Sequence, residues 1–343
     1  MSWGAGRLAL VRRMPLVAGT VGLLLLAAGA FAVGAYPVGV SELWAWAAWR
    51  LGLGEAPPPV VAAVIENIRG PRILAAMGVG AALATAGAAY QSLFRNPLVS
   101  PDILGVSSGA ALGAVIGIFL SLPMAGVEAA SFVGGLAAVA TVYGVAHVVR
   151  GHEPLLVLVL AGIVIGTLFS AGISILKVLA DPYNQLPAIT FWLLGSLAGA
   201  GRKELVLLAP ALVVGLTPLL LLRWRIDIMT LGEEEARALG VEAGRVRFIV
   251  IVAATLLTAT AVSVAGIIGW VGLVVPHLAR LLVGPAFARA APVAALGGGA
   301  FLLAVDTLAR GVSMVEIPLG VLTAVVGTPV FLWLLSTSRK GWG

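Results

Sequence analysis

The 343-residue sequence has no cysteine, and only 10% of its residues are charged. The lack of cysteine excludes a disulfide, a thiolate nucleophile and a zinc–thiolate site. Soluble domains are about one quarter charged. This scarcity of charge, together with a hydrophobic share of 60%, excludes a soluble enzyme, a disordered chain and a nucleic-acid-binding protein. In such a chain we interpret the net charge of +6 as a signal of how the protein is oriented in a membrane, because positive residues favour cytoplasmic loops.

Lysine and histidine are also scarce, with three residues each. No lysine follows a glycine, so the Gly-Lys-Ser/Thr loop that cradles nucleotide phosphates is absent and ATP is not bound by that motif. The three histidines, His147, His152 and His277, show no metal-ligand or triad spacing. The sequence therefore predicts no catalytic residue, no metal site and no cofactor.

Long apolar runs are abundant, and a spanning helix needs about 20 mostly apolar residues. Eleven candidates lie near 15–36, 71–94, 103–122, 124–148, 154–178, 186–200, 203–224, 246–268, 269–284, 290–310 and 317–337. If the short segment 186–200 lies at the outer surface, five arginines within 223–247 fall inside, where positive charge is favoured. We therefore predict an all-α membrane protein of about ten transmembrane helices, with both termini cytoplasmic and the first helix uncleaved.

Two stretches are too polar for the hydrocarbon. Residues 37–70 form a predicted periplasmic loop, in which the tryptophan-rich segment SELWAWAAWRL is expected to be an interfacial helix capped by Ser41. Residues 223–247 form the longest predicted cytoplasmic loop. Ser100-Pro101-Asp102 is expected to open the third span as cap, first residue and first-turn acid. Because no separate soluble domain is evident, residues 1–343 are expected to form one transmembrane domain.

Glycine makes up 44 residues, and small residues bring helices together in lipid. Gly80, Ala84 and Ala88 have the spacing of such a packing seam. Asp306 is the best candidate for a charge within a span, but it lies near the outer end with Arg310 four residues later. A local ion pair explains it more simply than an ion-coupled carrier does. A secondary carrier and an intramembrane enzyme remain as alternatives of other classes.

Three motifs need an explanation. Arg69 and Arg72 in RGPR, with Arg310, lie on the side that disfavours positive charge. They are either snorkelling helix ends or a basic rim for an acidic partner, and in a rim Arg69 and Arg72 are expected to be free to reach outward. The segment LGEEEARALGV (231–241) predicts a helix that Gly240 ends, and it is either a solvated surface helix or a contact for a cytoplasmic partner. Asn96-Pro97 predicts a turn within QSLFRNPL.

At these motifs the chain resembles the permeases of the iron-chelate, haem and cobalamin uptake family, the type II ABC importers. The resemblance covers most of the chain and is carried by RGPRIL (69–74), QSLFRNPLVSPDILGVSSGAALGA (91–114), LGEEEARALGV (231–241), GWVGLVVPHLARLLVG (269–284), DTLARGV (306–312) and EIPLGVLTAVVGTPVFLWLL (316–335).

The resemblance implies an inner-membrane permease that is not itself an enzyme. In this family two permeases pair with two ATPase subunits, and a periplasmic binding protein delivers the ligand. The resemblance assigns roles to three groups of residues in this sequence. They are Arg69, Arg72 and Arg310 for docking of the binding protein; Gly232, Glu233, Glu234, Glu235, Ala236, Leu239 and Gly240 for coupling to the ATPase; and Asn96 and Leu98 for the cytoplasmic gate.

The substrate is not fixed by these motifs. An iron–siderophore is expected on the frequency of such substrates in the family, and haem, cobalamin and molybdate-type oxyanions are the alternatives within the same machinery.

Overall fold

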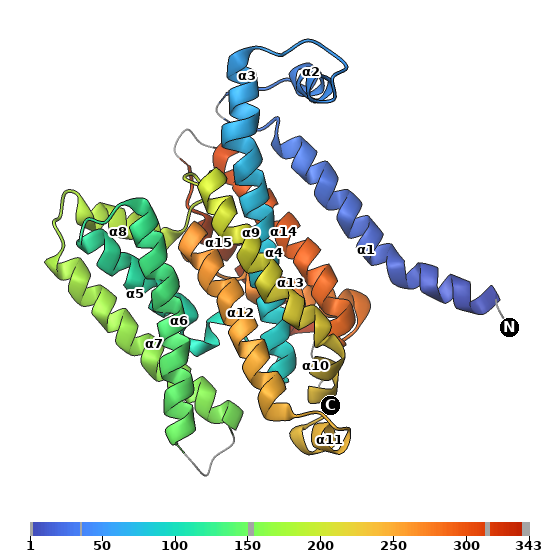
Figure 1. Cartoon of the computed structure of the whole chain (residues 1–343), viewed down its shortest axis with the longest axis vertical. Helices are drawn as coiled ribbons and strands as arrows, with labels where there is room; N and C mark the ends of the chain where they lie inside the picture. The colour runs from blue at the N-terminus through green and yellow to red at the C-terminus, as the bar shows by residue number, and fades with distance from the viewer. Residues whose placement is uncertain (1–2, 35, 150–153, 313–315, 338–343) are drawn as a thin grey trace.

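The computed structural model describes residues 3–34, 36–149, 154–312 and 316–337, and every regular element within them is helical (Figure 1). The elements are α1 (Trp3–Ala30), α2 (Val40–Arg50), α3 (Pro59–Ala63), the π-helical turn η1 (Val64–Arg69), α4 (Gly70–Leu93), the 3-10 turn η2 (Pro101–Leu104), α5 (Val106–Phe119), α6 (Met124–Val148), α7 (Pro154–Leu179), α8 (Gln185–Leu194), α9 (Arg202–Leu221), α10 (Arg223–Met229), α11 (Glu233–Ala238), α12 (Ala243–Ala265), α13 (Val271–Val283), α14 (Phe287–Gly311) and α15 (Leu319–Thr337).

Among the described helices, six are long and apolar enough to cross a membrane. These are the continuous helix Pro59–Leu93 and helices α6, α7, α9, α12 and α14. Four further predicted spans coincide with helices that contain shorter apolar stretches, namely α1, α5, α13 and α15. Helix α8, in the segment 186–200 that was predicted not to span, has only ten residues and is too short to cross a membrane. The prediction of an all-α membrane protein with about ten transmembrane helices is confirmed.

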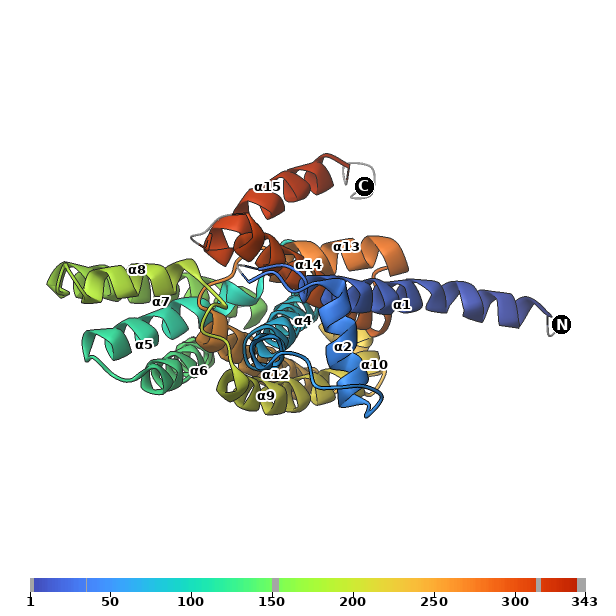
Figure 2. The same ribbon diagram turned by 90° about the horizontal axis from the view of Figure 1, so that it is seen from above.

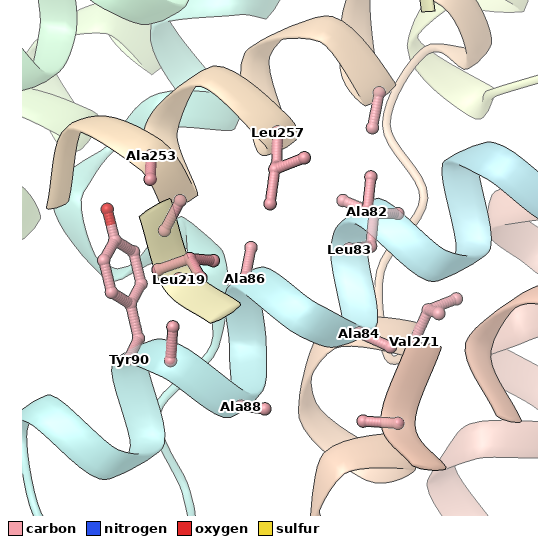
Figure 3. Packing of buried hydrophobic residues seen from close by; sticks show 14 of the residues in the cluster. Ala82, Leu83, Ala84, Ala86, Ala88, Tyr90, Leu219, Ala253, Leu257 and Val271 are labelled. Carbon is pink, nitrogen blue, oxygen red and sulfur yellow. The ribbon is translucent and has the colours of Figure 1, made fainter. Parts of the chain in front are cut away.

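Helix α4 lies at the centre of the bundle. Most of its residues are buried, and it packs against α14, α12, α13 and α9 (Figure 2). Figure 3 shows why these helices come so close: many α4 side chains that face its neighbours are alanines. The larger Tyr90 is fully buried, and its hydroxyl lies 3.2 Å from the Thr255 hydroxyl on α12.

Two residues of the predicted seam on α4, Gly80 and Ala84, face α14, whereas the Ala88 carbonyl accepts a hydrogen bond from Arg280 on α13. A methyl group built on Gly80 would lie 2.1 Å from the Gly298 carbonyl oxygen, so no side chain fits there. One turn on, a methyl group on Gly298 would lie 2.5 Å from the Cβ of Ala84. This close contact holds α4 against α14 by dispersion and shape, as expected for helices in lipid.

The molecule has two opposite ends. Helices α2 and α3 lie at one end, and α11 lies at the other (Figure 1). We call the first the arginine end, because it holds Arg69, Arg72 and Arg310, and the second the α11 end.

Three local predictions are wrong in detail. Helix α2 begins at Val40, and the side chain that caps it is that of Glu42, which accepts the Gly39 N–H at 2.8 Å, rather than that of Ser41. Pro101 starts a separate 3-10 turn, and the third span begins only at Val106. The predicted loop 37–70 is helical from Pro59 onward, because a π-turn carries the helix across Gly70-Pro71.

Candidate functional site

The π-turn η1 places the arginines of RGPR. A proline ring cannot follow a regular helical turn without a clash and lacks an N–H donor. The helix widens here, and the Gly70 N–H donates to the carbonyl of Ile65, five residues back. Single π-turns inside helices are often found at functional sites. Arg69 ends this turn, and Arg72 lies in the first turn of α4, so both reach the arginine end.

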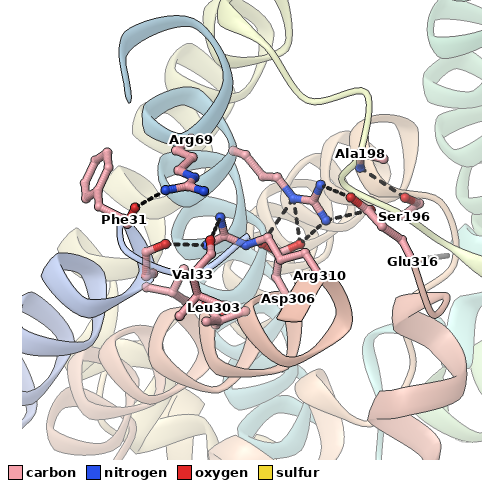
Figure 4. Close-up of polar contacts among 12 residues, drawn as sticks. Phe31, Val33, Arg69, Ser196, Ala198, Leu303, Asp306, Arg310 and Glu316 are labelled. Carbon is pink, nitrogen blue, oxygen red and sulfur yellow. Dashed lines mark hydrogen bonds and ion pairs between the residues drawn. The ribbon is translucent and has the colours of Figure 1, made fainter. Parts of the chain in front are cut away.

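Arg72 lies between two carboxylates from distant segments, those of Asp306 and Glu316, which are labelled in Figure 4. Its Nε and Nη2 atoms donate to Oδ1 of Asp306 at 2.9 and 2.8 Å. Its Nη1 and Nη2 atoms donate to Oε1 and Oε2 of Glu316 at 2.7 and 2.9 Å. Such fork-like pairs are stronger and more directional than single ion pairs. Arg72 therefore ties α4 to both ends of the α14–α15 connection.

Arg69 and Arg310 bind backbone carbonyls at the end of α1 (Figure 4). Arg69 donates to the carbonyls of Phe31 and Tyr36. Arg310 donates to those of Ala30 and Val33 at 2.9 and 3.0 Å. The last carbonyls of a helix have no partner within the helix, and cations near them are favourable. These two arginines thus hold the C-terminal end of α1 and the segment after it.

The three arginines are brought together as predicted, but they do not reach outward. Arg69, Arg72 and Arg310 are 3%, 7% and 9% exposed, so the expectation that the first two are free is wrong. The reason is the unpaired carbonyls and carboxylates around them. The predicted ion pair of Arg310 with Asp306 is confirmed, with Nε and Oδ2 3.4 Å apart.

Glu316 is the residue that sequence reasoning missed here. It comes just before α15, and its side chain is 38% exposed. The hydrogen bond from Arg72 is the largest influence on its carboxyl group and holds the pKa of Glu316 below its usual value, against the opposing effect of burial. The signal that could have found it is its position: Glu316 follows Arg310 by six residues, in the short segment between the last two predicted spans.

At the α11 end the predicted coupling helix is present. Helix α11 covers Glu233–Ala238, and Gly240 follows with a φ of 77°, the left-handed conformation in which glycine ends a helix. Ala236 is buried against the bundle, whereas Leu239 is 56% exposed. Glu233 accepts a hydrogen bond from Arg247 on α12 at 2.7 Å, which fixes α11 to that helix.

Four of the predicted coupling residues lie around one cavity. Gly232, Glu233, Glu234 and Glu235 line a cavity of about 360 Å³ that also involves Arg95 from the turn after α4. Acidic side chains at the first turn of α11 favour the helix because they oppose its dipole. The exposed residues of α11 and its end thus include the acids Glu234 and Glu235 and the apolar Leu239.

The turn that holds Asn96 and Leu98 is also exposed at the α11 end. The Asn96 side-chain oxygen accepts the Leu98 N–H at 2.9 Å, which closes the turn, and Leu98 is 44% exposed. Arg280 on α13 donates to the Ser92 hydroxyl at 2.8 Å and to the Pro285 carbonyl at 2.8 Å. Arg280 therefore joins the end of α4, just before this turn, to the loop that leads into α14.

Asp227 extends that link to the segment before α11. Its carboxylate accepts the backbone N–H groups of Phe287 and Ala288, at the start of α14. These donors have no partner within their own helix, so the carboxylate caps α14. Asp227, Arg280 and Asn96 line one cavity of about 470 Å³, so α10, α13 and the predicted gate turn meet there.

No metal centre is evident among the residues that the structure describes, where no three His, Asp or Glu side chains lie together.

Comparison with known proteins shows which family the chain belongs to. The FecCD transport family matches residues 22–337. The molybdate import system permease MolB of Haemophilus influenzae is 37% identical over 322 residues, which cover 94% of this chain and 95% of that protein. The hemin transport permease HmuU of Yersinia pestis is 38% identical and covers 93% and 94%. The cobalamin import permease BtuC of Halobacterium salinarum is 43% identical over 279 residues, 81% of this chain and 74% of that one.

The same fold occurs in a solved structure of a metal-chelate type ABC transporter in an inward-facing conformation. It is 36% identical, with a TM-score of 0.85, and the match covers 94% of this chain and 98% of that chain. The relatives are named as permeases of import systems, so this chain is a transport protein rather than an enzyme, and the carrier and enzyme alternatives are set aside. The chain belongs to the FecCD transport family and is a multi-pass membrane permease of an ABC importer.

Proposed function

We propose that the chain forms one transmembrane domain over residues 1–343 and works as a homodimer with two ATPase subunits and a periplasmic binding protein. The observation that carries this proposal is the separation of two contact surfaces. The arginine cluster lies at one end of the bundle and α11 lies at the other (Figure 1). A transporter that couples an external partner to an internal ATPase needs a contact surface at each end.

At the arginine end, Arg69, Arg72 and Arg310 serve to dock the acidic surface of the binding protein. The support is charge: three arginines gather around two carboxylates, which leaves an excess of one positive charge. A charged surface of this kind steers an oppositely charged partner and sets the association rate.

At the α11 end, the segment Gly232–Gly240 serves as the ATPase contact. The exposed Leu239 supplies an apolar anchor, and Glu234 and Glu235 are exposed beside it. Asn96 and Leu98 line the cytoplasmic gate in two symmetry-related copies, and Arg280 and Asp227 join that turn to the ATPase contact. A narrow apolar ring can close a pore by excluding water, so Leu98→Ala should raise solute leak.

The orientation follows the distribution of positive charge, with both ends of the chain cytoplasmic. The terminal residues 1–2 and 338–343 lie outside the described part of the structure.

The substrate that we propose is a metal chelate, and an iron–siderophore is the first to test. Several relatives are named for chelated metals: cobalamin, hemin and iron chelatin. One relative is instead named for molybdate, so an oxyanion is the alternative substrate.

The decisive experiment is vanadate-sensitive uptake into proteoliposomes that contain the permease and its ATPase. Iron–siderophore, hemin, cobalamin and molybdate would each be loaded on the binding protein. Uptake of one chelate that needs both ATP and the binding protein supports the proposal. Uptake driven by an ion gradient without ATP would reject it.

A further inference from the structure

The guanidinium of Arg72 has two hydrogen-bonding edges, and they differ in access to solvent. The edge formed by Nε and Nη2 faces Asp306, whose side chain is fully buried. The edge formed by Nη1 and Nη2 faces Glu316, whose side chain is 38% exposed. Within the described residues, Glu316 is therefore the member of the cluster that stands between Arg72 and solvent.

The two carboxylates also differ in how firmly the backbone holds them. Asp306 lies inside α14, where its side chain is fully buried and also pairs with Arg310 one turn later. Glu316 lies before the first residue of α15, Leu319, whose N–H donates to the Gly195 carbonyl at 2.9 Å. The side chain of Glu316 can swing toward solvent while this backbone bond stays in place.

The surface charge at the arginine end depends on Glu316. With both carboxylates in place, Arg69, Arg72 and Arg310 leave one excess positive charge, and without Glu316 they leave two. As the structure stands, an approaching acidic protein meets the Glu316 carboxylate before it meets Arg72. Like charges that face each other at an interface are unfavourable. Docking on Arg72 therefore needs the Glu316 carboxylate to give way.

We propose that Glu316 is an internal carboxylate that occupies Arg72 until a carboxylate of an acidic partner protein takes its place. This inference rests on the proposed docking of the binding protein at the arginine end. Docking is then an exchange, in which one fork-like pair with Arg72 is lost as another forms. Because the new pair replaces an old one, the complex gains little net free energy from it and can dissociate after each delivery.

The first test needs no partner and measures access to Arg72. The assembled transporter in lipid nanodiscs is treated with phenylglyoxal, which reacts with free guanidinium groups, and labelling of Arg72 is read by mass spectrometry. Glu316→Gln should label Arg72 about fivefold faster than wild type, the size expected for loss of a part-exposed ion pair. Glu55→Gln is the matched control, because Glu55 is an exposed acid predicted to lie on the same side. It should label like wild type.

The second test measures affinity for the solute-binding protein that stimulates the ATPase. Glu316→Gln should bind it about fivefold more tightly, with a steeper dependence on salt, and Glu55→Gln should bind like wild type. The gain should disappear when Arg72→Lys is added, because lysine lacks the fork that the exchange uses. Glu316→Asp keeps the charge on a shorter side chain and should show a smaller gain. It also serves if the glutamine variant folds poorly.

The outcomes separate this inference from the function on which it rests. If no binding protein docks on wild type, or docking ignores Arg72, the proposed function fails whatever Glu316 does. If docking needs Arg72 but neither Glu316 variant binds more tightly or labels faster, Glu316 is only a structural brace and the exchange is wrong. The labelling of Arg72 is also compared with and without the binding protein and at several phosphatidylglycerol contents of the nanodisc. If the lipid slows the labelling and the binding protein does not, the ligand of Arg72 is a lipid phosphate and the proposal is overturned.

Discussion

The Nη2 atom of Arg72 lies 2.8 Å from Oδ1 of Asp306, although the two residues are 234 positions apart in the sequence. The pair joins α4 to α14 at the arginine end, on the same two helices that meet at Gly80 and Gly298. Asp306 also pairs with Arg310, so one buried carboxylate balances two arginines. Its loss would leave Arg310 without this ion pair and Arg72 with Glu316 alone.

We therefore expect Asp306→Asn to destabilise the permease strongly. Removing one partner from a buried ion pair costs about 3–5 kcal/mol, because the remaining charge stays buried without its partner. The thermal unfolding temperature in detergent should fall by several degrees, and Glu55→Gln should leave it unchanged. An unfolding temperature of Asp306→Asn within a degree of wild type would show that the arginines find other partners.

A second prediction concerns the link between Arg280 and Ser92. Arg280→Gln removes the charged group that joins α13 to Ser92, just before the predicted gate turn, and to Pro285. The change leaves the helix that holds Ser92 and the loop that holds Pro285 unaltered in sequence. The ATPase should still assemble and hydrolyse ATP, while substrate uptake per ATP falls. The control is Arg289→Gln, which changes an exposed arginine at the same end. Equal uptake per ATP in both variants would exclude Arg280 from the coupling.

The third prediction concerns Gly240. Its φ of 77° suits glycine, and a β-branched residue there costs on the order of 1–2 kcal/mol. Gly240→Val should distort the end of α11 and reduce co-purification of the ATPase. Gly52→Val is a close control, since Gly52 has a φ of 72° and open space around it but lies near α2. If the two variants retain equal amounts of ATPase, α11 is not the contact.

The fourth prediction concerns orientation. The chain has no native cysteine, so one introduced cysteine gives an unambiguous label. Glu55 lies between α2 and α3, and Glu242 lies between α11 and α12; both are exposed, and these helix pairs mark opposite ends of the bundle (Figure 1). A membrane-impermeant maleimide added to intact spheroplasts should label Glu55→Cys, and it should label Glu242→Cys only after the membrane is opened. Labelling of both from outside would contradict the predicted topology.

Local patterns in the sequence were sufficient for the features that depend on neighbouring residues. The apolar runs predicted the spans and the short segment near α8, and the acids before Gly240 predicted α11. The i to i+4 spacing predicted the pair of Asp306 and Arg310. Each of these depends on helical periodicity or on a cap within a few residues.

Contacts between distant segments could not be predicted in that way. The pairing of Arg72 with Asp306 and Glu316 needs α4, α14 and the segment before α15 to meet, and no period in the sequence encodes that meeting. Arg69 was expected to reach outward, but it donates to the backbone carbonyls of Phe31 and Tyr36. Such partners could not be predicted, because every residue type carries a backbone carbonyl. The roles of these residues in docking, coupling and gating therefore stay predictions.

The last prediction uses the titration of Glu316. The Arg72 hydrogen bond holds the pKa of Glu316 below its usual 4.5, so the folded state favours the ionised form more than the unfolded state does. Stability from this pair is therefore fully present above about pH 4.5 and is lost as the pH falls through the folded-state pKa. Because the side chain is part-exposed, the pair contributes only about 0.5–1 kcal/mol, or about 1–3 °C in unfolding temperature.

Wild type should thus unfold at a slightly higher temperature than Glu316→Gln, by a constant difference from pH 5 to pH 8. Below pH 4.5 the difference should shrink, because wild-type Glu316 then becomes neutral like the glutamine. The charged groups that face Glu316 are Arg72 and Arg310, and these and the neighbouring Asp306 are present in both proteins, so their own effects cancel in the comparison. A difference that grows on acidification, or one that changes between pH 5 and pH 8, would mean that Glu316 is not held ionised by Arg72.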